Sequence, residues 1–292
     1  VPGAAQDAEN YRECSPDGRL CFALETVAEA PHYSVTRDGK PVIALSRLGF
    51  LLRGAGKWGN RVALGEAVRR DHQGEWEQPW GESRVVRDHY REIRIPITEL
   101  GKTERRIDLI ARVFDGGVGF RFAFPAQDQL SDVMIDEELT EFNISGDAEA
   151  WWIPGGDWNR YEYLYKKTPI EEVSTAHTPM TVRLADGTHL AFHEAALVDY
   201  SGMWLRRMED HRFRAQLAPS SRGAKVVREG AFTTPWRTIR IADDAAGLVE
   251  NDLELNLNEP NKLGDVSWFE PAKYVGIWWG MIRGDWTWAQ GP

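Results

Sequence analysis

The stretch Val118-Gly-Phe-Arg-Phe-Ala-Phe124 places an apolar side chain at every second position. Successive side chains of a β-strand point to opposite faces, so the valine and the three phenylalanines would share one face. Such a face is typical of the core of a β-sandwich. Residues 107–114 precede it across the turn sequence Asp-Gly-Gly, and the two stretches are predicted to form a hairpin.

Short stretches of this kind recur between turn signals along the chain. Asp-Gly pairs stand at residues 38–39, 115–116 and 186–187, where tight turns between strands are expected. No stretch before residue 270 has convincing helical periodicity longer than two or three turns. Residues 135–142 are predicted as either a short helix or an acidic edge. The sequence therefore predicts an all-β fold, a large antiparallel sandwich.

Composition excludes several classes of function. The 292 residues include 45 acidic and 35 basic side chains, a net charge of −10, and no nucleic acid partner is expected because such binding depends on concentrated Lys and Arg. No apolar run approaches the ~18 residues that span a membrane. We find no motif for phosphate binding, zinc or an activated nucleophile. The 13 tryptophans suit a large core or the apolar faces of sugars.

The two cysteines, Cys14 and Cys21, flank a Pro-Asp-Gly turn signal. Their thiols could face each other across a hairpin and form a disulfide, which would indicate an oxidising compartment. Two free thiols that happen to be close are the alternative. Residues 1–10 are small and polar and are predicted to be a loose N-terminus. No signal peptide is present, so it was either removed or never there.

A carboxylate continues an inward-facing pattern in residues 187–200. Leu190 and Phe192 alternate with small or polar residues, and the next position on their face is Glu194. A buried carboxylate has to be neutralised, hydrogen-bonded, or bound to a cation such as Ca²⁺. Alternatively, Glu194 lies at the strand end, where the face has already turned to solvent.

The middle of the chain is aromatic and polar, in Trp151-Trp-Ile-Pro-Gly-Gly-Asp-Trp158 and Tyr161-Glu-Tyr-Leu-Tyr165. These side chains could form the wall of a carbohydrate cleft, since binding residues tend to lie on loops of a rigid scaffold. They could equally cap the sandwich. The lone His177 that follows is expected to be structural.

The C-terminal region contains an alternating stretch followed by a continuous apolar stretch. Residues 252–258 alternate like a strand, and Tyr274-Val-Gly-Ile-Trp-Trp279 reads as a continuous apolar strand. Continuous apolar strands are typical of parallel barrels, where both faces are buried. A parallel strand needs neighbours reached by crossover connections. The chain is therefore expected to stop just after starting a second domain.

Seven motifs occur together in a fixed order, and in that order they resemble glycoside hydrolase family 97. They are Ser15-Pro-Asp-Gly18, Ser46-Arg-Leu-Gly-Phe50, Phe114-Asp-Gly-Gly-Val-Gly-Phe-Arg121, His193-Glu-Ala-Ala-Leu197, Thr234-Pro-Trp-Arg-Thr238, Leu255-Asn-Leu-Asn-Glu-Pro260 and Lys273-Tyr-Val-Gly-Ile-Trp-Trp279. The resemblance implies a bacterial, periplasmic or secreted exo-acting α-glycosidase, either an α-glucosidase or an α-galactosidase. It also implies a galactose mutarotase-like β-super-sandwich, a central (β/α)₈ barrel and a small C-terminal β domain.

The resemblance assigns the parts of this chain. Residues 11–260 would be the super-sandwich, 261–272 a linker, and 273–292 the first strand of a truncated catalytic barrel that contacts the sandwich. Glu194 matches the family's Ca²⁺ ligand, and Trp278 and Trp279 would end the first barrel strand near the sugar site. The catalytic acid, base and nucleophile are expected on barrel loops outside this chain, so inverting and retaining mechanisms both stay open.

Two other functions are compatible with the residues. A non-catalytic sandwich could hold glycans against its tryptophans. A self-contained sugar epimerase could use His and Glu as acid and base, since mutarotases use a similar super-sandwich. Glycan retention without cleavage would favour the former, and anomer interconversion the latter.

Overall fold

The computed structural model describes residues 10–78, 81–276 and 278–284. Every strand pair among these residues is antiparallel. The eight-stranded sheet contains, in spatial order, β1 (Arg12–Cys14), β2 (Leu20–Val27), β3 (Ala30–Arg37), β4 (Lys40–Arg47), β13 (Glu141–Ile144), β20 (Arg212–Leu217), β19 (Met203–Glu209) and β16 (Thr175–Ala176).

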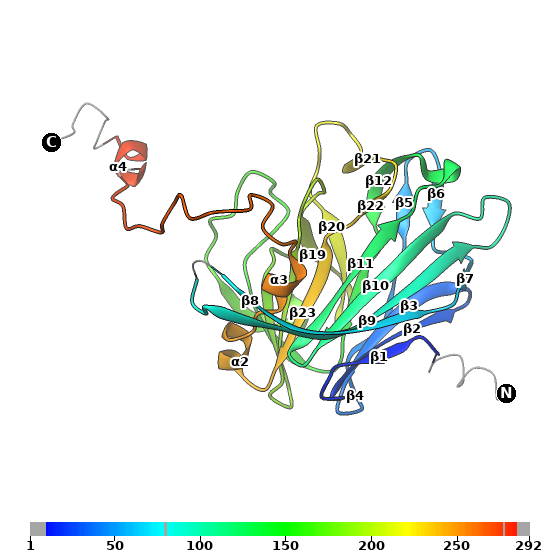
Figure 1. Ribbon diagram of the computed structural model, residues 1–292, viewed down its shortest axis with the longest axis horizontal. Coiled ribbons are helices and arrows are strands. Elements are labelled where there is room, and N and C mark those ends of the chain that lie inside the picture. The colour runs from blue at the N-terminus through cyan, green and yellow to red at the C-terminus, as the bar shows by residue number, and fades with distance from the viewer. Residues whose placement is uncertain (1–9, 79–80, 277, 285–292) are drawn as a thin grey trace.

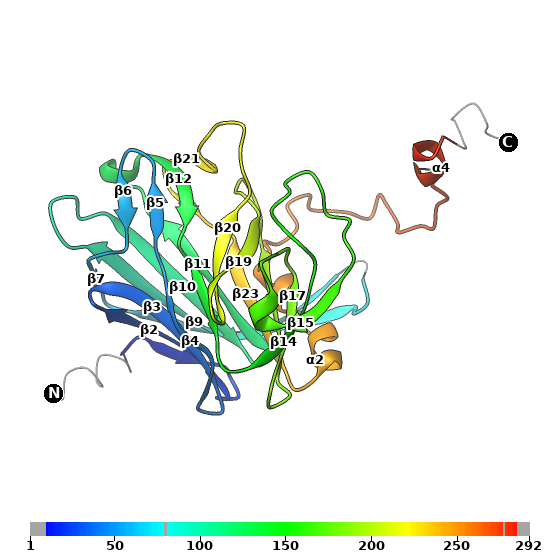
Figure 2. The same cartoon turned by 180° about the vertical axis from the view of Figure 1, so that it is seen from behind.

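An eleven-stranded sheet packs against the first one (Figures 1 and 2). Its path is β15 (Lys166–Pro169), β14 (Ala148–Trp152), β17 (Met180–Leu184), β18 (His189–Ala195), β23 (Trp236–Ala242), β11 (Gly117–Phe124), β10 (Arg106–Phe114), β9 (Val85–Glu99) and β7 (Val62–Leu64). Off this path, β8 (Val68–Glu77) pairs with β9, and β22 (Phe232–Thr233) pairs with β11.

A smaller four-stranded sheet and short helices complete the fold. The sheet contains β21 (Val226–Glu229), β12 (Asp132–Glu138), β5 (Phe50–Leu52) and β6 (Gly56–Trp58). The helices are the 3₁₀ turns η1 (Asp128–Leu130) and η2 (Ile170–Glu172) and the α-helices α2 (Ala245–Val249), α3 (Leu253–Leu257) and α4 (Trp278–Ile282). No helix within the described residues is long and apolar enough to cross a bilayer.

The core lies between the two large sheets, and aromatic side chains from both meet there. The rings of Tyr33 on β3 and Phe120 on β11 are 4.6 Å apart, and those of Phe142 on β13 and Phe192 on β18 are 5.7 Å apart. Aromatic rings at such distances attract each other in addition to burying apolar surface. The all-β sandwich predicted from the sequence is confirmed.

The hairpin predicted around the Asp-Gly-Gly turn is also confirmed. Strands β10 and β11 pair antiparallel, with Phe114 opposite Gly117. The predicted inward face is buried throughout, from Val118 at 0 % to Phe124 at 1 % exposed. Residues 135–142 form no helix. Residues 135–138 belong to β12 and residues 141–142 to β13, and these two strands lie in different sheets.

The first hairpin carries the two cysteines. Cys14 on β1 and Cys21 on β2 are register partners, and a disulfide joins them. The bond lies beside the Pro-Asp-Gly turn, where Ser15 N–H donates to the carbonyl of Leu20.

The strand predicted over residues 252–258 is wrong, because this segment forms helix α3. Leu253 and Leu257, four residues apart, lie on one side of the helix and pack with Tyr90, Phe114 and Trp236 on the outer face of the eleven-stranded sheet. In a helix, positions i and i+4 are neighbours. The alternation of leucines fitted a strand equally well, and the apolar patch on the sheet decides between the two.

The strand predicted over residues 274–279 is not formed either. Residues 274–276 have no regular structure, Ile277 lies outside the described residues, and Trp278 and Trp279 begin helix α4. An apolar parallel strand is stable only between hydrogen-bonded neighbours, and no described strand lies beside this segment. It instead extends away from the sandwich (Figures 1 and 2). Its assignment to a catalytic barrel stays a prediction.

Candidate functional site

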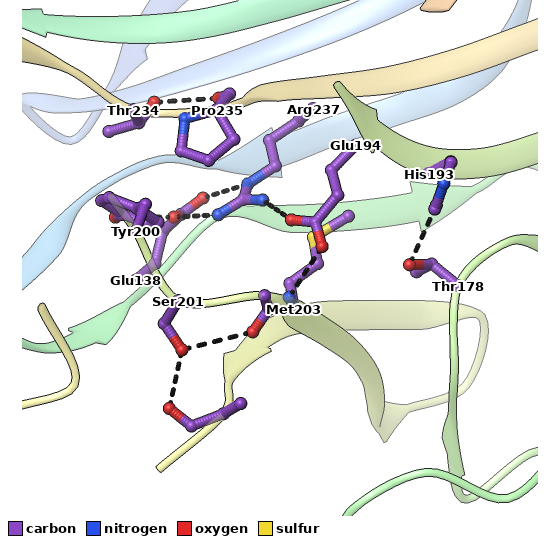
Figure 3. Close-up of polar contacts among 12 residues, drawn as sticks. Glu138, Thr178, His193, Glu194, Tyr200, Ser201, Met203, Thr234, Pro235 and Arg237 are labelled. Atoms are coloured by element: carbon purple, nitrogen blue, oxygen red, sulfur yellow. Dashed lines mark hydrogen bonds and ion pairs between the residues drawn. The ribbon is translucent and has the colours of Figure 1, made fainter. Parts of the chain in front are cut away.

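Glu194 lies near the end of β18 (Figure 3). The alternation of side chains along the strand puts it on the same face as the buried Leu190 and Phe192. Its register partner on β23 is Arg237. Opposite charges at directly paired positions of a sheet attract, and Arg237 Nη1 donates to Glu194 Oε2 at 2.6 Å. The inward-facing carboxylate therefore has a cation as its partner.

The guanidinium of Arg237 is fully buried and binds a second carboxylate. Its Nε and Nη2 donate to Oε1 and Oε2 of Glu138 at 2.9 and 2.6 Å. Two parallel hydrogen bonds of this kind fix both partners in one plane. The hydroxyl of Tyr200 donates to Glu138 Oε2 at 3.1 Å (Figure 3). One arginine thus ties β23 to β12, β18 and the loop after β18.

The ion pairs and hydrogen bonds of this cluster determine the protonation states of its side chains. Burial alone would raise the pKa of Glu138, but the charge and hydrogen bonds of Arg237 lower it below its ordinary value. Burial would lower the pKa of Arg237, and Glu138 and Glu194 raise it instead. Burial raises the pKa of Tyr200 well above its usual range, and Glu138 adds to that effect. Glu138 is ionised, Arg237 charged and Tyr200 neutral near neutral pH.

The cluster carries more negative than positive charge. Two carboxylates, Glu138 and Glu194, face the single guanidinium of Arg237, which leaves one negative charge over. Glu138 is sealed in the core, whereas the Glu194 side chain is 8 % exposed. Its second oxygen, Oε1, accepts only from the N–H of Met203, at 3.1 Å, among the contacts of the described residues. The surplus charge therefore lies at Glu194.

Glu194 lies in the wall of a cleft of about 440 Å³. Its lining includes the loop of residues 157–162 together with His177, His193 and Trp204. Trp158 is 73 % and Tyr161 51 % exposed. A cleft of this size can hold a small molecule, and the aromatic side chains offer flat apolar surface beside the carboxylate.

The two aromatic groups of the middle segment have different environments. Trp152 is buried, and its indole N–H donates to Thr168 Oγ1 at 3.1 Å. Trp158, Tyr161 and Tyr165 are exposed. Trp152 therefore packs in the sandwich, whereas the exposed rings of Trp158, Tyr161 and Tyr165 can contact a ligand.

The histidines of the cleft are held in neutral form. Burial lowers the pKa of His193, although the carboxylates of Glu254 and Glu194 oppose the shift, and its Nδ1 lies 3.1 Å from Thr178 Oγ1. Burial also lowers the pKa of His177, whose Nδ1 accepts the indole N–H of Trp204 at 3.1 Å. An indole only donates, so Nδ1 of His177 is the acceptor nitrogen.

The structure does not bring the other predicted site residues to this cleft. Trp278 and Trp279 lie on α4 and are 65 % and 69 % exposed, on the segment that leads away from the sandwich (Figure 1). Sequence reasoning missed Arg237, Glu138 and Tyr200. A signal for Arg237 existed, since it alternates with Ile239 and Ile241, which face the core.

The carboxylate oxygens of Glu194 are suitable ligands for a hard cation, but one carboxylate does not provide all the ligands that such an ion needs. Calcium takes six to eight oxygen ligands, and Glu194 contributes one carboxylate with the surplus charge described above. Among the described residues, the group of three His or carboxylate side chains that lie close enough to share an ion consists of Asp147, Glu171 and His211. That group does not include Glu194. A calcium ion at Glu194 would need further oxygen ligands from elsewhere.

Comparison with known proteins extends these observations. A family model described as the glycosyl-hydrolase 97 N-terminal domain matches residues 14–260. A retaining α-galactosidase of Bacteroides thetaiotaomicron is 22 % identical over 94 % of this chain and 45 % of its own length. A probable retaining α-galactosidase of Streptomyces bingchenggensis is 27 % identical over 90 % of this chain and 39 % of its own length.

A solved enzyme structure has a fold closely similar to that of this chain. The glycoside hydrolase family 97 enzyme of Pseudoalteromonas sp. strain K8, determined in complexes with panose and with acarbose, superposes with a TM-score of 0.90 at 42 % identity. The match covers 95 % of this chain and 42 % of that enzyme. The chain thus spans less than half the length of these relatives. With the family model matched from the first hairpin to the end of α3, the chain belongs to glycoside hydrolase family 97.

Proposed function

We propose that this chain is the N-terminal sandwich of a Ca²⁺-dependent, exo-acting α-glycosidase, which removes terminal α-linked hexose. The observation that carries the proposal is the position of Glu194. Its carboxylate accepts a hydrogen bond from a buried arginine and lies in the wall of a cleft of about 440 Å³. The relatives named above are enzymes of the same family, and two are named as α-galactosidases. In this proposal the remaining length of the protein supplies the catalytic barrel.

Glu194 would be one oxygen ligand of the calcium ion. Arg237 and Met203 each donate one hydrogen bond to this carboxylate, and each oxygen retains a further lone pair. The role of this chain is to hold the carboxylate in one orientation, because Arg237 is itself fixed by Glu138. A bound calcium ion supplies charge that polarises a glycosidic oxygen or a nearby acid. The other ligands would come from the barrel.

The substrate proposal rests on the relatives. The enzyme that binds panose and acarbose is 42 % identical to this chain, whereas the α-galactosidases are 22 % and 27 % identical. Panose is an oligosaccharide of α-linked glucose, so the higher identity favours a terminal α-glucoside. We also propose a periplasmic or secreted location, in line with the disulfide between Cys14 and Cys21.

The test is hydrolysis of nitrophenyl α-glucoside and nitrophenyl α-galactoside by the full-length protein, with and without a calcium chelator. We expect cleavage of the glucoside that the chelator abolishes and added Ca²⁺ restores. Cleavage that a chelator leaves unchanged would contradict the calcium role. Absence of cleavage of both, together with retention of the chain on immobilised α-glucan, would favour a second function, glycan binding by Trp158 and Tyr161 at the cleft.

A further inference from the structure

A second cavity lies against the outer face of the eight-stranded sheet and shares no lining residue with the Glu194 cleft. Side chains of β19 and β20 line one side of it, and Glu137, Leu139 and Lys225 line the other. Its volume is about 170 Å³. This is several times the ~30 Å³ that a water molecule occupies in the liquid, yet below the ~300 Å³ at which drug-sized pockets begin. The cavity therefore suits a group of a few heavy atoms.

Two arginines stand side by side in its wall. Arg206 on β19 and Arg214 on β20 are direct register partners, and both line the cavity. Like charges directly opposite each other in a sheet are destabilising. The pairing therefore calls for a source of negative charge between or above the two guanidinium groups.

The neighbouring carboxylates do not satisfy this need. Arg214 Nη2 donates to Glu141 at 2.8 Å, and Lys225 Nζ donates to Glu137 at 2.6 Å, so each carboxylate already has a cation. Within the described part of the chain, no hydrogen bond or ion pair joins the side chain of Arg206 to another residue. The Nε of Arg214 is buried and has no hydrogen-bond partner there. Guanidinium donors are left over on both arginines.

The surroundings are also cationic. Burial, together with the charges of Arg47 and Arg214, lowers the pKa of Lys57 on β6, although Glu141 opposes the shift. The Nε of Arg47 is buried without a partner, like that of Arg214. In a protein whose net charge is −10, this corner is a local excess of positive charge. Such a corner attracts anions.

We propose that this cavity binds a small oxyanion of the phosphate type between Arg206 and Arg214, with Lys225 at its edge. The fork of donors on each guanidinium matches the oxygen atoms of a phosphate. A shared anion would turn the repulsion between the two arginines into attraction to one ligand. Free phosphate and the phosphate end of a sugar phosphate share this chemistry. The site lies outside the cleft of the proposed glycosidase and does not depend on that function.

The experiment is a calorimetric titration of the 292-residue chain with inorganic phosphate and, separately, with glucose 6-phosphate, in a buffer free of other oxyanions. We expect saturable binding that weakens as NaCl is added, because salt screens partly exposed charges. Arg206→Gln should weaken binding about 10- to 100-fold, the effect of losing a charge-assisted hydrogen bond. The control Arg70→Gln removes an equal charge from exposed β8 and should leave binding unchanged.

The affinities for inorganic phosphate and for glucose 6-phosphate are compared. Tighter binding of the ester would assign the site to a phosphorylated ligand, and equal binding would assign it to the free anion. The proposal is overturned if neither anion binds saturably, or if Arg206→Gln binds as the wild type does.

Thermal unfolding separates a binding role from a structural one. In phosphate-free buffer Arg206→Gln should melt no lower than the wild type, since the substitution removes a repulsion. Phosphate should raise the melting temperature of the wild type and of Arg70→Gln but not that of Arg206→Gln. A lower melting temperature of Arg206→Gln without phosphate would show that Arg206 stabilises the fold itself, and would overturn the proposal.

Discussion

Arg237 determines the geometry of the candidate site at the scale of single residues. Its guanidinium has no exposed surface and lies between two carboxylates from different strands. A buried ion pair adds little net stability, but removing one partner leaves a charge that nothing compensates. The arginine is therefore required for the fold in the same place where it orients Glu194.

Arg237→Met tests this requirement. The substitution leaves Glu138 buried without a cation, so we expect the free energy of unfolding in urea to fall by about 3–5 kcal/mol. The double variant Glu138→Gln/Arg237→Met has no buried charge at these positions and should recover part of the loss. A decrease no larger than about 1 kcal/mol, the value of an exposed pair, would contradict the account.

The sequence predicted part of this cluster. Glu194 follows Leu190 and Phe192 on an inward face, and Arg237 follows the same rule with Ile239 and Ile241. Alternation can therefore show that two charged side chains face the core. It cannot show that they meet Glu138, because that contact joins strands 99 residues apart in the chain.

At the scale of elements, helix α3 shows that the spacing of apolar residues alone does not distinguish a helix from a strand. Its three leucines at alternate positions fit a strand, while two of them, four residues apart, fit one side of a helix. Leu253 and Leu257 are both 2 % exposed, whereas Leu255 is 39 % exposed. Gly119 on strand β11 has no side chain and so leaves room for Leu257 of the helix. A methyl group at this position would collide with that leucine. Tertiary packing decides the element here.

A pair of alanine substitutions distinguishes the helix from a strand. Leu257→Ala should lower the free energy of unfolding by about 2–5 kcal/mol, as expected for a buried leucine. Leu255→Ala, the matched control on the exposed side, should change it by about 0.5 kcal/mol or less. Equal losses for both variants in urea unfolding would indicate a strand that buries all three leucines on one face.

Strands with strong alternation and a turn between them were predictable, because their pairing is local. The β10–β11 hairpin needs only the short connection between Phe114 and Gly117. Residues 274–279 are different, since the partners of a parallel strand are never sequence neighbours. Their apolar run could indicate burial but could not supply the other strands.

At the scale of the whole molecule, the proposed function needs Glu194 to be accessible to a second part of the protein. The two large sheets bury nearly all of the sandwich core between them, and Glu194 lies at the end of β18, in the wall of the cleft. Beyond α3, the segment from residue 261 to α4 carries exposed Trp268, Tyr274 and Val275. Such exposed apolar side chains mark surfaces that another domain can cover.

The most direct test of the account is the Ca²⁺ dependence of hydrolysis by the full-length protein carrying Glu194→Gln. Glutamine keeps the shape of the side chain but removes the charge that a hard cation prefers. The account predicts that the Ca²⁺ concentration for half-maximal activity rises by about tenfold or more, while the control Glu149→Gln, at an exposed ion pair, behaves as the wild type. Unchanged turnover of Glu194→Gln at limiting Ca²⁺ would contradict it.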